Sequence, residues 1–447
     1  MATNTRRISV FDLAAMSAGE RARLLRRTEA DLGGFLDAVR PIVEAVRAEG
    51  DAALVRYARE LDRAELRPGE LRADEADFAR AYEELAPEVV EAIDYAVANI
   101  RAVHEAQRPE EMWLKEVRPG AFAGDRYRPI PAVACYVPRG KGAFPSVTMM
   151  TTVPAVVAGV PRVLVITPPG PGGRFDAATL VACDRAGVRE VYRCGGAQGI
   201  AAVAFGTETV PRVDKVVGPG SPYVVAAKRL LADRIDTGPP AGPSESVVLA
   251  DRSANGRIAG LDLIIESEHG PDSSAFLVTD SREVAEAAIA AIPGYWAQMG
   301  ARWVEYSSAV LCGPQGGVVL APDMDAAVAF VNDYAPEHLE ILAEEPMAYL
   351  GRIDNAAEIL IGPHTPFVLG NFVIGVNCVL PTGGWAKTWS PLSVFDFLKR
   401  SSIAHVTPRA YPELARHARV LATYEGFEGH ANAVSETRDA AFESQEE

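Results

Sequence analysis

Cysteine is scarce in this chain of 447 residues. The five cysteines are spread singly, with no Cys-x-x-Cys pair among them: Cys135, Cys183, Cys194, Cys312 and Cys378. An odd number of isolated thiols favours a protein of the reducing cytosol over a disulfide framework.

Long hydrophobic runs are also missing. Residues 147–167 come closest to a membrane span, but they contain Arg162 and two prolines, whereas a span needs about 18 uncharged apolar residues. Near the N-terminus, Asp12, Glu20 and several arginines interrupt the apolar stretch that a signal peptide requires. We therefore expect a soluble cytoplasmic protein without a membrane partner.

Positive charge is in deficit. Lysine and arginine together number 44 against 60 aspartates and glutamates, a formal net charge of −16. Such acidity argues against nucleic acid as a partner. The 48% hydrophobic and 23% charged composition excludes a disordered or fibrous chain. At about 150 residues per domain, the length predicts two to four domains.

The common ligand-binding signatures are absent too. No Gly-x-Gly-x-x-Gly, P-loop or Gly-x-Ser-x-Gly motif occurs, which removes the most frequent nucleotide and acyl-transfer sites. Two glycine turns, Gly195-Gly196-Ala197-Gln198 and Gly218-Pro219-Gly220-Ser221, open predicted helices. Either their backbone N–H groups meet a phosphate, or they are plain tight turns.

What the chain does have is an alternation of short apolar runs and helical patterns. The runs at 132–137, 163–167, 190–194 and 215–217 end in Gly or Pro turns, and the alternation resumes from 246 to 361. Continuous apolar strands between helices predict parallel sheets covered on both faces, with ligands at the carboxyl ends of the strands. We predict an α/β fold with two doubly wound units. A helical region that ends near residue 120 precedes them, and a C-terminal arm follows them.

Glu266 and His269 lie three residues apart on a predicted helix, so both project from one face. A carboxylate and a neutral imidazole at this spacing can hold a divalent metal. The alternative is a solvated helix end, since Gly270-Pro271 ends the helix directly afterwards.

Glu337 and His338 follow Pro336, at the entry to an apolar strand. Because adjacent side chains on a strand point to opposite sides, this acid and imidazole can serve two proton transfers on one substrate. The alternative is a capping glutamate beside a surface histidine. His430, in a charged stretch, has a similar alternative.

Together these segments resemble the histidinol dehydrogenase family from about residue 30 to 440. The shared motifs are Tyr136-Val137-Pro138, Gly195–Gln198, Gly218-Pro219-Gly220, Ala241–Glu245, Glu268–Ser273, Tyr334–Leu339, Val379–Thr382 and the final His430.

The resemblance implies a homodimer of chains with two Rossmann-like domains, NAD as cofactor, zinc or another divalent metal, and a C-terminal arm exchanged between subunits. It assigns 1–120 to a helical region packing with the second α/β unit and 121–240 to a cofactor domain. It assigns 241–388 to a domain with the metal and catalytic residues, and 389–447 to the arm. Family members oxidise an alcohol through an aldehyde to a carboxylate.

Matched residue by residue, His338 is the base for the alcohol and Glu337 the base that activates water. The other matches are Tyr136, Gln198 and Ser221 for the cofactor, Ser244, Glu425 and Cys378 for the substrate, and Glu266, His269, Asn371 and His430 for the metal.

Three of these positions depart from the family. Glu266 stands where the family has glutamine and Asn371 where it has aspartate, so the metal would still meet one anionic and one neutral oxygen donor. Cys378 stands where the family has a substrate-binding histidine, and a thiol supplies neither the charge nor the reach of an imidazolium. Arg139 and Lys141 add two cations after Tyr136 that would bind an anionic substrate group, the cofactor pyrophosphate or only solvent.

These departures predict NAD-dependent, metal-assisted oxidation of a small polar primary alcohol other than histidinol, for example a polyol or hydroxylated sulfonate. The alternatives are histidinol dehydrogenase itself and a non-catalytic binding paralogue.

Overall fold

The computed structural model describes residues 7–27, 32–139 and 142–443. They divide into two compact units. The first contains the chain up to Arg108 and Ile130–Phe397, and the second contains Pro109–Pro129 and the chain from Leu398. Within the described residues, no helix combines the length and hydropathy that crossing a membrane requires.

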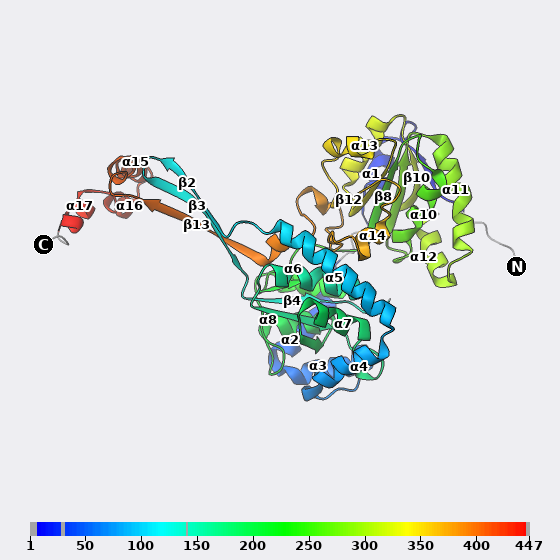
Figure 1. Ribbon diagram of the computed structural model, residues 1–447, viewed down its shortest axis with the longest axis horizontal. Helices are drawn as coiled ribbons and strands as arrows, with labels where there is room; N and C mark the ends of the chain where they lie inside the picture. The colour runs from blue at the N-terminus through cyan, green and yellow to red at the C-terminus, as the bar shows by residue number, and fades with distance from the viewer. Residues whose placement is uncertain (1–6, 28–31, 140–141, 444–447) are drawn as a thin grey trace. The chain divides into compact units, whose positions relative to one another are not determined.

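The first unit contains a sheet of four parallel strands in the order β6-β5-β4-β7, of which Figure 1 labels β4. The strands are β4 Ala132–Tyr136, β5 Arg162–Thr167, β6 Glu190–Arg193 and β7 Lys215–Val217. The helices that follow them are α6 Pro145–Val157, α7 Ala177–Ala186, α8 Gly196–Phe205 and α9 Pro222–Leu230. Helix α6 packs on α7, and α8 packs on α9. The strand order reverses between β4 and β7, and such a reversal marks a ligand crevice at the carboxyl ends of the strands.

Four helices of the N-terminal region pack against the helices that cover this first sheet. They are α2 Gly33–Glu49, α3 Asp51–Asp62, α4 Glu75–Glu84 and α5 Pro87–Gln107. Helix α2 contacts α8 and α9, α3 contacts α8, and α4 and α5 contact α7. The expectation that this region packs with the second α/β unit was therefore wrong for α2, α3 and α4. Helix α5 does contact that unit, because Asn99 Nδ2 donates to the Val373 carbonyl over 2.9 Å. Amphipathic periodicity shows which face of a helix is buried, but it does not identify the partner.

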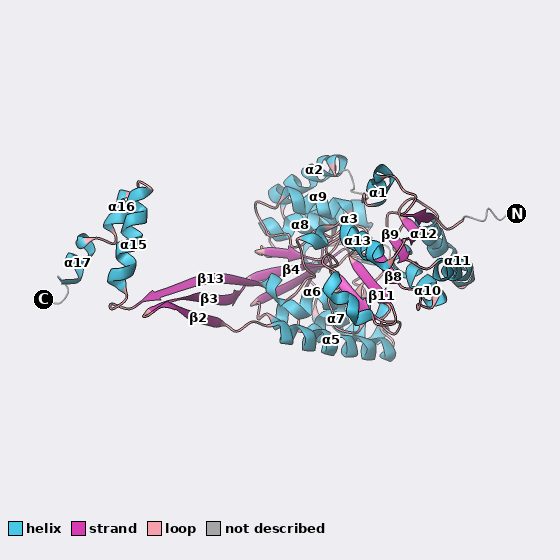
Figure 2. Ribbon diagram, turned by 90° about the horizontal axis from the view of Figure 1, so that it is seen from above, coloured by secondary structure: helices cyan, strands magenta, loops and turns pink. Residues whose placement is uncertain are grey.

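The first unit also holds a sheet of six parallel strands in the order β1-β10-β9-β8-β11-β12, of which Figure 2 labels β8, β9 and β11. The strands are β1 Val10–Asp12, β8 Glu245–Ala250, β9 Ser274–Thr279, β10 Gly316–Leu320, β11 His338–Leu342 and β12 Glu358–Ile361. Its helices are α1 Ala18–Leu24, α10 Gly256–Ser267, α11 Arg282–Trp296, α12 Ala301–Leu311, α13 Met324–Tyr334 and α14 Phe367–Phe372. One apolar core lies between the sheet and α10–α12, and another lies on the side of α1 and α13.

Short 3-10 helices complete the first unit. They are η1 Pro68–Glu70, η2 Pro171–Gly173, η3 Pro346–Arg352, η4 Trp385–Lys387 and η5 Val394–Phe397.

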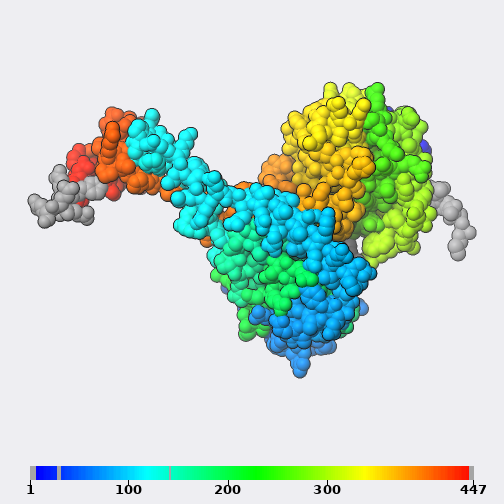
Figure 3. Space-filling model, viewed as in Figure 1, coloured from blue at the N-terminus to red at the C-terminus, as the bar shows by residue number. Residues whose placement is uncertain are grey.

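The second unit is an antiparallel sheet in the order β13-β3-β2, followed by helices. Its elements are β2 Met112–Arg118, β3 Ala121–Pro129, β13 Leu398–Val406, α15 Tyr411–Tyr424, α16 Glu428–Asn432 and α17 Glu436–Glu443. Residues around 120 contact those just after β13, since the Thr407 amide donates to the Gly120 carbonyl (Figure 3).

The bounds of the second unit differ from two of the predicted domain boundaries. Residues 121–129 do not belong to the first Rossmann-like domain, and the C-terminal part begins at Leu398 rather than 389. The hairpin was missed because all seven residues of β2 are exposed, so it lacks the buried apolar alternation that identifies a strand. The prediction of an α/β fold with parallel sheets is confirmed.

Candidate active site

Glu337 and His338 lie where α13 gives way to β11. Helix α13 ends at Ala335, which adopts a left-handed conformation (φ 51°), and Pro336 prevents the helix from continuing. Both side chains are buried, Glu337 at 8% and His338 at 3% exposure. The Glu245 amide donates to Glu337 Oε2 over 2.9 Å, which holds that carboxylate at the start of β8. The surface alternative for this pair is therefore excluded.

His338 is held by a carboxylate that sequence reasoning missed. β11 pairs with β12 so that His338 lies opposite Glu358, and His338 Nδ1 is 2.6 Å from Glu358 Oε2. Both side chains are about 4% exposed. A carboxylate at Nδ1 fixes that nitrogen as the donor and leaves Nε2 to exchange a proton. Nε2 lies 3.9 Å from Glu337 Oε1. The only signal in the sequence was an acidic residue opening an otherwise apolar strand.

The predicted metal residues of the first unit converge on Glu266. Its carboxylate is buried, with Oε2 3.0 Å from His269 Nδ1 and Oε1 accepting a hydrogen bond of 2.7 Å from Asn371 Nδ2. Oxygen and nitrogen donors of this kind suit zinc and related divalent ions. The three residues therefore fit a metal once the amide of Asn371 turns its oxygen inward. Among the described residues, no group of three or more His, Cys, Asp and Glu side chains forms a metal site, so a site here depends on that amide.

The buried charges in this region shift one another's protonation. Burial raises the pKa of Glu337 to about 8. Burial also opposes the charge on His338, but the carboxylates of Glu266, Glu337 and Glu358 outweigh it and raise the pKa of His338 to about 10. The pKa of Glu266 falls to about 2 because His269 and His338 overcome the cost of its burial. At neutral pH Glu337 is therefore neutral, His338 is charged and Glu266 is ionised, and a cation bound at Glu266 would lower the pKa of both His338 and Glu337.

A buried ion pair lies behind Glu337. Arg27 Nε is 2.7 Å from Glu245 Oε1, with the two side chains 8% and 5% exposed. The Arg27 guanidinium covers the Tyr334 ring and donates to the Tyr334 carbonyl. Glu245 Oε1 also accepts from the Gly383 amide over 2.9 Å. Arg27 and Glu245 were not predicted, because Arg27 is one of two adjacent arginines after α1 and has no pattern that distinguishes it from a surface residue.

Two predicted substrate residues also belong to the first unit. The Cys378 Sγ donates to the Asn371 carbonyl over 3.4 Å, and burial raises the pKa of its thiol. The thiol therefore stays neutral beside the metal residues. Ser244 directly precedes β8, and its carbonyl accepts from the Ser274 amide. Their contacts with a substrate stay predictions.

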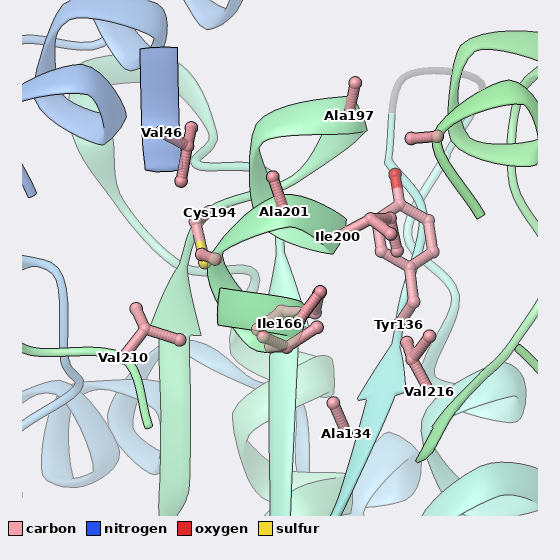
Figure 4. Packing of buried hydrophobic residues seen from close by; sticks show 14 of the residues in the cluster. Val46, Ala134, Tyr136, Ile166, Cys194, Ala197, Ile200, Ala201, Val210 and Val216 are labelled. Carbon is pink, nitrogen blue, oxygen red and sulfur yellow. The ribbon is translucent and has the colours of Figure 1, made fainter. Parts of the chain in front are cut away.

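The predicted cofactor residues lie at the carboxyl end of the first sheet. Tyr136 ends β4, and its hydroxyl points toward the start of α8, where it accepts from the Gly196 amide over 3.3 Å (Figure 4). Gln198, 3% exposed, lies in the first turn of α8. Ser221 begins α9, and its side chain caps no backbone amide of that helix.

The other predicted residues are placed as follows. The Arg139 guanidinium covers Gly170, and Nη1 donates to the Arg174 carbonyl over 3.5 Å, while Lys141 lies outside the described residues. Glu425 ends α15 and His430 lies in α16, so both belong to the second unit. Their roles stay predictions.

Known proteins match almost the whole chain. The family model described as histidinol dehydrogenase matches residues 25–438. The chain belongs to the histidinol dehydrogenase family. It is 63% identical to "Histidinol dehydrogenase homolog" of Cereibacter sphaeroides over 96% of this chain and 97% of that protein. It is 45% identical to "Histidinol dehydrogenase" of Synechocystis over 96% of this chain and 98% of that protein.

The solved histidinol dehydrogenase of Elizabethkingia anophelis shares the fold, with a TM-score of 0.92, 28% identity, and coverage of 97% of this chain and 98% of that one. Histidinol dehydrogenases are oxidoreductases that use NAD and a divalent metal, so the family places this chain among dehydrogenases.

Proposed function

We propose that this protein oxidises a small polar primary alcohol other than histidinol through an aldehyde to a carboxylate, reducing two NAD with a divalent metal bound at Glu266, His269 and Asn371. The observation that carries the proposal is the buried His338, fixed at Nδ1 by Glu358 and next to the buried Glu337. This arrangement provides two proton-exchanging groups with separate tasks at one place. A divalent cation bound beside them would lower the pKa of both, so that each can accept a proton.

In the first oxidation, His338 Nε2 accepts the alcohol proton as the carbon loses a hydride to NAD, which leaves an aldehyde, NADH and a proton. In the second, Glu337 accepts a proton from water as the oxygen adds to the aldehyde carbon. The hydrate then loses a second hydride to NAD and becomes a carboxylate. One alcohol, one water and two NAD thus give one carboxylate, two NADH and three protons.

Glu266, His269 and Asn371 would hold the metal, with His430 as a further ligand from the C-terminal arm of a homodimer. When bound, the ion supplies Lewis acidity toward the substrate oxygen. The ionised Glu266 provides the anionic donor that such an ion needs. Carefully purified protein should contain about one divalent ion per subunit, or be activated by added zinc; protein with neither property contradicts the metal assignment.

A substrate other than histidinol is supported by Cys378, a neutral buried thiol in place of the family's substrate-binding histidine. The chain is also more similar to the relative named as a homolog, at 63% identity, than to the one named histidinol dehydrogenase, at 45%. A missing polar contact in a buried site typically costs about 1–3 kcal/mol, which is enough to change the preferred substrate.

The deciding experiment counts NADH formed per alcohol consumed. Zinc-loaded protein is incubated with histidinol and with a panel of small polyols, amino alcohols and hydroxylated sulfonates. We expect one panel alcohol to give two NADH per molecule, and Glu337→Gln to give about one with release of aldehyde. Rapid turnover of histidinol would instead establish that the protein is a histidinol dehydrogenase. No turnover of any alcohol by protein that binds NADH would favour a binding role.

A further inference from the structure

The first sheet carries a carboxylate that the proposed function has not yet used. Asp62 is the last residue of α3, and α3 packs against α8. Gln198 Nε2 donates to Asp62 Oδ2 over 3.4 Å. Together with burial, the Asp62 carboxylate contributes to the raised pKa of the Tyr136 hydroxyl and of the Cys194 thiol, so it lies near the ends of β4 and β6.

Asp62 has weak protein partners for a partly buried acid. Among the described residues, Asp62 forms no ion pair, and the hydrogen bond that its side chain accepts from Gln198 is long, at 3.4 Å. Burial raises its pKa to about 6, so the carboxylate is ionised at neutral pH but incompletely solvated. Hydrogen bonds from hydroxyl groups stabilise an ionised carboxylate that is incompletely solvated, whereas a phosphate is repelled by its charge.

NAD offers hydroxyl donors in matched pairs. Each ribose presents two vicinal hydroxyl groups, and a carboxylate accepts such a pair with its two oxygens. In doubly wound sheets an acidic residue at the carboxyl end of the strands accepts the ribose 2′-hydroxyl, and a 2′-phosphate there would meet a like charge. Asp62 supplies this chemistry from a helix of the N-terminal region rather than from the end of a sheet strand.

We propose that Asp62 accepts the hydroxyl pair of a ribose of NAD and is a cofactor-specificity residue of this enzyme. The proposal rests on the proposed function, because Gln198 is a cofactor residue only if NAD binds here. Gln198 then also acts as a positioning residue, since its amide orients the Asp62 carboxylate.

The test measures binding rather than turnover, by the fluorescence change of NADH on titration with protein. Wild type is compared with Asp62→Asn, which keeps the shape and removes the charge, and with Asp62→Glu, which keeps the charge and moves it outward. Asp37→Asn, on the exposed face of α2, is the matched control. Thermal unfolding of each variant shows whether the fold is intact.

We expect Asp62→Asn to weaken NADH binding about 10- to 100-fold, Asp62→Glu to weaken it less, and Asp37→Asn to leave it unchanged. Competition with AMP and with nicotinamide mononucleotide, the two halves of NAD, identifies which ribose Asp62 contacts. Asp62→Asn should weaken the binding of only the half that contains that ribose. If it is the adenosine ribose, wild type should bind NADPH far more weakly than NADH, and Asp62→Asn should narrow that gap.

Folded Asp62→Asn protein that binds NADH within twofold of wild type would overturn the proposal while leaving the proposed function intact. Wild-type protein that binds no NADH would overturn both.

Discussion

The two parallel sheets of the first unit carry different chemistry at their strand ends. Around β4 and α8, the groups are neutral or backbone, apart from Asp62 and Arg139: the Tyr136 hydroxyl, the Gln198 amide and the amides of a glycine turn. Around β8, β11 and β12, six buried acids and one imidazole are gathered: Glu245, Asp262, Glu266, Glu337, Glu340, Glu358 and His338. Burying so many charges is costly, so they are retained where they perform chemistry or are paired.

This comparison predicts a division of labour. Changes around the six-stranded sheet should alter turnover or stability and leave NADH binding intact. Changes near α8 should weaken NADH binding and leave turnover and stability intact. The three substitutions below test it from the largest expected effect to the smallest, each with NADH binding measured in parallel.

Arg27→Met should lower the free energy of unfolding by about 3–5 kcal/mol, because it leaves Glu245 buried without its cation. Urea unfolding measures the loss. The double variant Arg27→Met with Glu245→Gln removes both charges and should recover most of it. A loss below about 1 kcal/mol, as for an exposed pair, would show that the pair is not stabilising.

Glu358→Gln should lower kcat about 10- to 100-fold, because the amide keeps the shape but not the charge that orients His338 and stabilises it when it is protonated. KM for NAD should stay within twofold. Glu344→Gln, an exposed residue just after β11, is the control. If kcat were unchanged, the contact between Glu358 and His338 would be structural only.

Glu340→Gln should change how stability depends on pH. Glu340 and Asp262 are both buried acids in contact, and burial together with Asp262 raises the pKa of Glu340 from its ordinary 4.5. A group whose pKa is higher in the folded than in the unfolded protein contributes stability that is fully present below pH 4.5. That contribution is lost as the pH rises through the pKa of the folded protein. The Tm of wild type should therefore fall between pH 5 and 9 by several degrees more than that of Glu340→Gln. Equal slopes for the two proteins would contradict the raised pKa.

The sequence predicted the interior of this molecule better than its exposed parts. The apolar run at 215–217 is β7, and the alternation expected from 246 to 361 contains the strands from β8 to β12, because continuous apolar runs between turns are typical of buried parallel strands. β2 escaped prediction because its side chains are exposed. The packing of α2–α5 escaped because long-range contacts leave no local periodicity.

In the candidate site too, the sequence predicted residues that form local patterns and missed those brought together by long-range contacts. Glu337 and His338 were found because a proline and an acid–imidazole pair interrupt an apolar segment, and Glu266 because its spacing to His269 is local. Glu358 and Arg27 could not be found in this way, since 20 residues separate Glu358 from His338 and over 200 separate Arg27 from Glu245.

The sequence by itself determined the α/β class, most buried strands, the family, and which local pairs of side chains share a face, because these depend on periodicity and spacing along the chain. Only the tertiary structure decided that Glu358 fixes the tautomer of His338, that Arg27 neutralises Glu245, and that Asp62 meets Gln198. Strand register and helix packing bring those groups together, and burial then sets their charges.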